Sequence, residues 1–249
     1  TFFPGVELRT DKGGNNLHII LIFPDDSDLE VLEQDFRATM IRRHAKGGDS
    51  NDTIYWDFHD IVEFAHTHKG LISIHAGKKS NGIDREIKVT NAVPYRDAVK
   101  NEIANAVDFF EIGQESDITT YRQHVFPSIG ERPLIICSDN HNPMAYTRNA
   151  DLWIKAQCTF EGLKQCLYQP AERIHIGSVP PVLDRVSKNA KSVIKSISVS
   201  PTPDAKHASE KWFDFSLPLN PGLVAVIGNK GSGKSALSDI IGLLCKCKT

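Results

Sequence analysis

The sequence lacks the features that most directly assign a protein to a class. Its formal net charge is −2 with 24% charged residues, so no global excess of positive charge predicts nucleic acid or a membrane as partner. Its longest apolar run, residues 17–23, is far too short to span a bilayer. No signal peptide is visible. The chain starts at Thr1 and not at methionine, which is what we expect if its true N-terminus is missing from this sequence.

Paired cysteines are also lacking. The five cysteines are odd in number and form no C-x-x-C pair, which argues against a disulfide framework and against a zinc ribbon. A reducing cytoplasm is the simplest location for such a chain. With 249 residues, 40% of them hydrophobic, it can form one large α/β domain or two smaller ones.

What the sequence does contain is an alternation of short apolar strands and helical stretches through roughly its first 178 residues. This alternation predicts a parallel sheet or a barrel with helices outside, whose functional groups lie at the C-terminal ends of the strands. We take Asp117 and Thr159 as N-caps of the last two helices. We expect strands at 17–23, 70–75, 108–113, 133–139, 152–156 and 173–177, and helices at 28–44, 57–68, 95–107, 117–126 and 159–168.

After residue 178 the composition changes, so we expect two domains, 1–178 and 179–249. Residues 184–211 are basic and rich in Ser and Pro. We interpret them as a solvated linker, with contact to nucleic acid as the alternative. Further strands are predicted at 192–200, 211–219 and 223–228.

Residues 228–235, GNKGSGKS, fit the phosphate-loop pattern G-x-x-x-x-G-K-S. In this pattern the glycines let backbone N–H groups turn toward phosphate oxygens, the lysine reaches the β- and γ-phosphates, and the serine holds Mg²⁺. The predicted helix 235–244 adds a dipole that favours the anion. We therefore predict that ATP and Mg²⁺ bind at Gly228, Asn229, Lys230, Gly231, Ser232, Gly233, Lys234 and Ser235.

Residues with metal-ligand side chains lie at strand ends or in adjacent turns of the first domain. Imidazole and carboxylate together suit Zn²⁺, Mn²⁺ or Fe²⁺ at an open catalytic site. We exclude the one H-x-H pair, His66 and His68, because it lies at the C-terminal end of a predicted helix. The helix dipole favours cationic side chains there without any metal. The candidate ligands are Glu7, His18, His75, Asp139 and His141.

These residues resemble the motifs of the PHP family, the polymerase and histidinol phosphatase domain. GVE followed by LHII, then ISIHAGK, then ICSDNH, is similar to successive motifs of this distorted (β/α)₇ barrel of metal-dependent phosphoesterases. WIKAQCTFEGLKQCLYQPAERIHIG resembles the end of the PHP domain in TrlF-like proteins, with QC where we expect DP. LPLNPGLVAVIGNKGSGKSALSDII resembles the opening of SMC and ABC-type ATPases.

The resemblance implies hydrolysis of a phosphate ester at a cluster of divalent metal ions. It assigns Glu7 to a bridge between two ions, His18 and His75 to one of them, Asp139 to the second and His141 to a third. Glu7, Asp139 and His141 are then the catalytic residues.

Three further residues each have two possible assignments. Glu111 is either a further ligand or a partner of a ligand. Lys78 and Lys79 grip the substrate phosphate in one interpretation and are exposed loop lysines in the preferred one.

The chain departs from the family pattern in two places. An H-x-H motif should precede Glu7, and residues 1–4 do not supply it. Either the first strand of the barrel is missing from a fragment, which is then inactive, or the site is incomplete. The acidic Walker B strand and the signature loop of the ATPases are also absent, so we expect only the start of that domain.

The leading hypothesis is a metallophosphoesterase directed at nucleic acid or a nucleotide and coupled to an SMC-like ATPase, in DNA repair or defence against phage. We expect a homodimer through the ATPase domain of the full-length protein. The first alternative is a degenerate, non-catalytic barrel that scaffolds or regulates a DNA-associated ATPase. A small-molecule phosphatase is the second alternative, which fits the barrel but not the attached ATPase.

Overall fold

The computed structural model describes residues 2–10, 17–42, 55–79, 81–86, 101–138, 140, 142–202 and 214–246. The chain divides into two units, Thr1–Pro180 and Pro181–Thr249. The sequence had placed the domain boundary between residues 178 and 179. None of the helices described is both long and apolar enough to cross a membrane.

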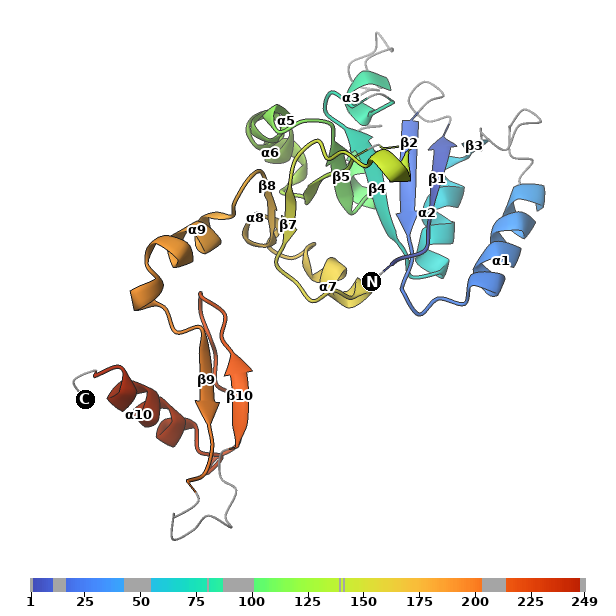
Figure 1. Ribbon diagram of the computed structural model, residues 1–249. Helices are drawn as coiled ribbons and strands as arrows, with labels where there is room; N and C mark the ends of the chain where they lie inside the picture. Colours follow the sequence, from blue (N-terminus) through green and yellow to red (C-terminus); the bar gives the residue numbers. More distant parts are fainter. Residues whose placement is uncertain are drawn as a thin grey trace. The chain divides into compact units, whose positions relative to one another are not determined.

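A six-stranded mixed sheet forms the centre of the first unit (Figure 1). The strand order is β3 (Tyr55–Trp56), β1 (Gly5–Thr10), β2 (Leu17–Ile22), β4 (Leu71–Ala76), β5 (Phe109–Ile112) and β6 (Leu134–Ile136). β2 runs antiparallel to its neighbours β1 and β4, whereas the β4–β5, β5–β6 and β1–β3 pairs are parallel. In the described part of the chain this sheet does not close into a barrel, and the unit is a mixed α/β fold.

The antiparallel start of the sheet corrects the expectation of a purely parallel one. Residues 11–16, which link β1 to β2, are too few for the crossover that parallel strands need, so the two strands pair as neighbours. The strands β1 and β3 were not predicted at all. The other four strands of the sheet lie within the predicted ranges or one residue beyond them.

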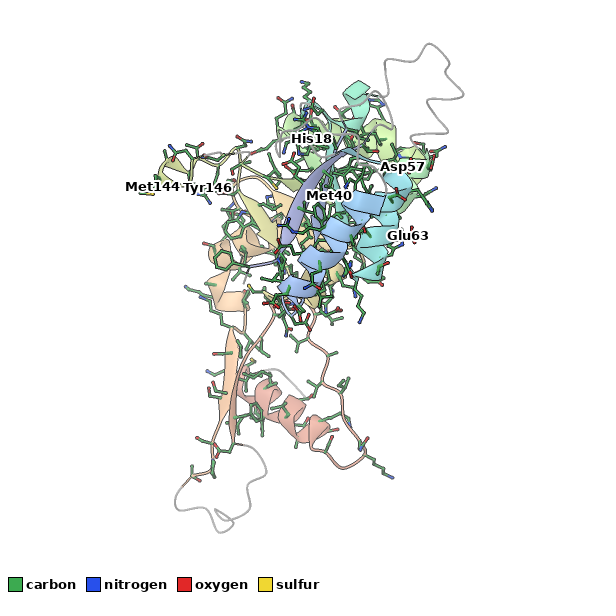
Figure 2. All side chains as sticks on the ribbon, turned by 90° about the vertical axis from the view of Figure 1, so that its right-hand side faces the viewer. His18, Met40, Asp57, Glu63, Met144 and Tyr146 are labelled. Atoms are coloured by element: carbon green, nitrogen blue, oxygen red, sulfur yellow. The ribbon has the colours of Figure 1, made fainter. Side chains whose placement is uncertain are left out.

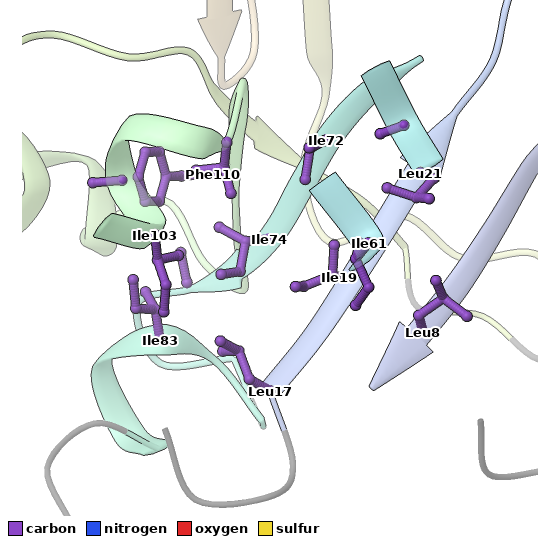
Figure 3. Packing of buried hydrophobic residues seen from close by; sticks show 14 of the residues in the cluster. Leu8, Leu17, Ile19, Leu21, Ile61, Ile72, Ile74, Ile83, Ile103 and Phe110 are labelled. Atoms are coloured by element: carbon purple, nitrogen blue, oxygen red, sulfur yellow. The ribbon is translucent and has the colours of Figure 1, made fainter. Parts of the chain in front are cut away.

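One face of the sheet packs against α1 (Leu29–Arg42) and α2 (Phe58–Thr67). Along β2, Leu17, Ile19 and Leu21 are fully buried on this face and alternate with half-buried residues, as the period of a strand requires (Figure 3). The carboxylate of Asp57 accepts the backbone N–H of His59 and caps α2. Figure 2 labels Met40 on α1, Glu63 on α2 and Asp57, the N-cap of α2.

A smaller apolar cluster lies on the opposite face of the sheet, under α7 (Phe160–Gln165). Thr159 caps this helix by accepting the Gly162 N–H at 3.0 Å, as predicted. The four cysteines that the structure describes form no disulfide, and one of them, Cys166, is buried in this cluster. Beside the helix lie β7 (Leu152–Ile154), α8 (Pro170–Arg173) and β8 (Ile174–Ile176), with β7 antiparallel to β8.

The helical stretch after β5 begins earlier than predicted. Its first helix has Glu115 as N-cap, so Asp117 lies inside the first turn and is not the cap. Asp117 is 3% exposed and accepts the backbone N–H of Lys78, a contact from outside the helix. The stretch comprises α5 (Ser116–Thr120), the π-helix η2 (Tyr121–Val125) and α6 (Phe126–Ile129), and the short helix α3 (Ile83–Glu86) follows β4.

The second unit corrects two further expectations. The presumed linker begins with a helix, α9 (Pro181–Lys188), and residues 223–228 are not a strand. No strand in the described part of the chain pairs with residues 223–228, and Leu223 and Ile227 are 92% and 89% exposed. The unit also contains η4 (Ala190–Ser192), the antiparallel pair β9 (Ser196–Val199) and β10 (Phe215–Pro218), and α10 (Lys234–Leu244).

Candidate metal centre

Charged and imidazole side chains form a row across four adjacent strands of the sheet. In the β1–β2 register Arg9 lies opposite His18, so Glu7, two residues away on the same face, is a diagonal neighbour of His18. The β2–β4 register pairs Ile19 with Ile74, and the next position brings His18 beside His75, with ring centroids 5.1 Å apart. The row therefore runs from Glu7 through His18 to His75.

Glu7 and His18 are joined directly. His18 Nδ1–H donates to the Glu7 carboxylate. This hydrogen bond holds the pKa of Glu7 below its ordinary value of 4.5; partial burial opposes the effect, and the charges of His18, His75 and Lys79 reinforce it. The Glu7 side chain is 52% exposed and the His18 side chain 13% exposed, so the row is open to solvent at its carboxylate end.

The orientation of His18 is fixed by Asn81, a residue that the sequence analysis did not select. The Asn81 side-chain amide Nδ2 lies 3.0 Å from His18 Nε2, and the Asn81 backbone carbonyl accepts the His18 backbone N–H at 3.1 Å. This contact holds the His18 ring with its other nitrogen, Nδ1, toward Glu7. Asn81 has φ of +55°, a left-handed conformation that asparagine tolerates better than most residues. The asparagine residue type is therefore the sequence signal that could have indicated this turn.

The row continues on β5 with Glu111, which the β4–β5 register places opposite His75. Glu111 Oε1 lies 3.9 Å from His75 Nε2. The Glu111 carboxylate also accepts from the Lys79 ammonium, and all three side chains are buried. The interpretation of Lys79 as an exposed loop lysine is therefore wrong, whereas Lys78 is exposed. The Lys79 side chain points into the protein because the Glu111 carboxylate, with which it pairs, is buried.

Glu7, His18 and His75 fit a metal ion by both chemistry and position. Each offers one ligand atom, and these three atoms lie within 4.8 Å of one another. One carboxylate and two imidazoles are a donor set that Zn²⁺, Mn²⁺ and Fe²⁺ accept. Glu7 lies inside β1 and not after a strand, so its place in the group comes from the pairing of strands.

The other two sequence-predicted ligands, Asp139 and His141, lie outside the described residues. His66 is in the last turn of α2 and His68 is its C-cap, as the exclusion of this pair assumed. His68 Nε2 lies 3.4 Å from an Asp35 carboxylate oxygen, and its ring packs on Phe64 with centroids 4.6 Å apart.

The phosphate loop of the second unit has the backbone that its glycines predict. Gly231 and Gly233 have φ of +83° and +85°, which only glycine adopts freely. Lys234 Nζ donates to the carbonyls of Gly228 and Asn229 at 2.8 Å each, so the ammonium lies within the loop. The helix α10 begins at Lys234, where the sequence predicted a helix. The loop is thus followed by a helix N-terminus, the arrangement that favours bound phosphate.

No family model, characterised protein or solved structure matches this chain. The resemblance to the PHP and SMC families therefore stays a prediction. The function proposed below rests on the geometry of the Glu7, His18 and His75 group and of the loop 228–235.

Proposed function

We propose that the first unit is a metal-dependent phosphoesterase of the PHP type and that the second is the beginning of an SMC-like or ABC-like ATPase domain. The observation that carries the proposal is the convergence of Glu7, His18 and His75 from three strands. In this proposal the mixed sheet is part of a distorted PHP-type barrel.

The residues of the first unit prepare the site in three ways. Glu7 is kept ionised by its hydrogen bond from His18, so it brings a negative charge that attracts a cation. Asn81 orients the His18 ring, and burial restricts the ring of His75. The exposed side of Glu7 leaves an approach for a substrate. A divalent ion bound there supplies Lewis-acid chemistry for the hydrolysis of a phosphate ester.

The second unit supports a role in nucleotide binding. Its loop presents glycine-rich backbone and the Lys234 ammonium in one place, which suits ATP with Mg²⁺. An ATPase of this kind coupled to a phosphoesterase favours a nucleic acid or nucleotide as the substrate, in DNA repair or phage defence. Because ABC-type ATPases act as paired heads, we also propose that the full-length protein dimerises through this domain.

The test measures Mn²⁺-dependent hydrolysis of bis(p-nitrophenyl) phosphate and of single-stranded DNA by the complete gene product. His75→Ala should lower the rate by at least roughly 100-fold, because the site loses one of its ligands. ATP binding should not change. His59→Ala, which removes an exposed histidine of α2 outside the triad, is the matched control and should keep the wild-type rate.

Equal hydrolysis in the wild type and in His75→Ala would contradict the assignment of the site. A wild type that binds ATP but hydrolyses neither substrate with Mn²⁺, nor with Zn²⁺ or Fe²⁺ in its place, would favour the alternative. In that case the first unit is a non-catalytic module that scaffolds or regulates the ATPase.

A further inference from the structure

A buried ion pair behind the triad has no role in the proposed function. Lys79 is 8% exposed and Glu111 is 2% exposed, and the Lys79 ammonium donates to the Glu111 carboxylate. Taking two charges out of water is costly, and replacing such a pair by apolar side chains is often neutral or stabilising. Stability alone therefore does not account for its position.

The position of Glu111 relates it directly to the metal triad. His75 and Glu111 are opposite each other in the parallel β4–β5 register, so their side chains leave the same face of the sheet. Glu111 Oε1 approaches His75 Nε2 to 3.9 Å. The carboxyl group of Glu111 thus continues the row that contains Glu7 and His18, on the far side of His75.

The turn that delivers Lys79 is held in place by other elements. Gly77 has φ of +65°, and its N–H donates to Asp84 Oδ2 of α3 at 2.8 Å. The Lys78 N–H donates to Asp117 Oδ2 of α5 at 3.1 Å. A turn fixed from two helices gives Lys79 one direction, toward Glu111.

We propose that Glu111 is a positioning residue for His75 and that Lys79 is the counter-ion that keeps Glu111 in this place. A histidine that binds a metal commonly has a carboxylate at its other ring nitrogen, which sets the ring orientation and raises ligand basicity. A carboxylate held by Lys79 performs this task without entering the metal site itself. The inference rests on the proposed function of the triad.

The experiment is a titration of metal-free protein with Co²⁺, followed by visible absorption. Glu111→Gln should weaken Co²⁺ binding by roughly 10- to 100-fold, the usual effect of losing such a partner. Glu115→Gln makes the same chemical change at an exposed residue four positions along and should bind like the wild type. Urea unfolding of each metal-free variant measures stability separately.

A double variant separates positioning from a merely structural role. Lys79→Met with Glu111→Gln removes both charges, so no buried charge is left without a partner and the fold should keep a near-wild-type urea midpoint. Positioning predicts that Co²⁺ binding stays weak in this variant. Wild-type affinity for Co²⁺ in the double variant or in Glu111→Gln would overturn this inference and leave the proposed function unaffected. Failure of the wild type itself to bind Co²⁺ would overturn the proposed function and the inference together.

Discussion

At Glu7, a charge inside a strand is kept ionised by residues of β2, of β4 and of the turn after β4. His18 donates to its carboxylate, and the charges of His75 and Lys79 act in the same direction. These contacts stabilise the charged form in the folded protein only. The acid stability of the metal-free protein should therefore depend on Glu7.

The sign of this dependence follows from the lowered pKa of Glu7. Its contribution to stability is fully present above the ordinary pKa of 4.5, and it is lost as the pH falls through the lower pKa of the folded state. Glu7→Gln should therefore be less stable than the wild type at pH 6, and this difference should shrink below pH 4.5. Urea unfolding of metal-free protein across this range measures it. A difference that is constant with pH would contradict the account.

At the same scale, residue type and position at strand ends or in adjacent turns identified Glu7, His18 and His75 as candidates. They did not identify Asn81 or the buried position of Lys79. Both depend on the course of the turn after β4, which brings Asn81 to His18 and turns Lys79 toward Glu111. Lysine and asparagine are mostly exposed in proteins, so their types alone predict a solvated loop.

At the scale of elements, the turn after β4 depends on the conformation of a single glycine, Gly77. Gly77 adopts φ of +65°, and a Cβ there would lie 2.5 Å from Asp117 Oδ2. Gly77→Ala should lower the free energy of unfolding by about 2 to 4 kcal/mol, through backbone strain and displacement of Asp117. Urea unfolding followed by circular dichroism measures this loss.

Gly113→Ala is the matched control for this substitution. Gly113 follows β5 and faces the same turn, but a Cβ there would meet Lys79 no closer than 3.4 Å, an ordinary contact. Its free energy of unfolding should stay within about 1 kcal/mol of the wild type. Equal losses in the two variants would show that the turn does not depend on the conformation of Gly77.

The sequence-based predictions were wrong at β1 and at residues 223–228, for different reasons. β1 alternates apolar Val6 and Leu8 with Glu7 and Arg9, the pattern of a half-buried strand, so its sequence did carry a signal that the prediction missed. The run 223–228 has strand composition, yet a strand also needs a partner, and none of the described residues supplies one. Pairing is a property of the whole fold, so local composition does not determine it.

At the scale of the whole molecule, the chain carries two candidate sites, each built from residues of its own unit. Lys234→Ala should therefore abolish ATP binding and leave Co²⁺ binding at the triad unchanged. The ammonium of Lys234 lies within the loop, where it would contact the phosphates, so ATP affinity measured by calorimetry should fall to an undetectable level. A weakened Co²⁺ affinity in the same variant would show that the sites are coupled.

The central claim is that Glu7, His18 and His75 hold a transition metal. The most direct measurement is the metal content of the protein, by mass spectrometry, after purification without chelators. The wild type and His59→Ala should each contain about one zinc, manganese or iron ion more per chain than the His18→Ala/His75→Ala variant. Equal metal content in all three proteins, or none in the wild type, would contradict the account.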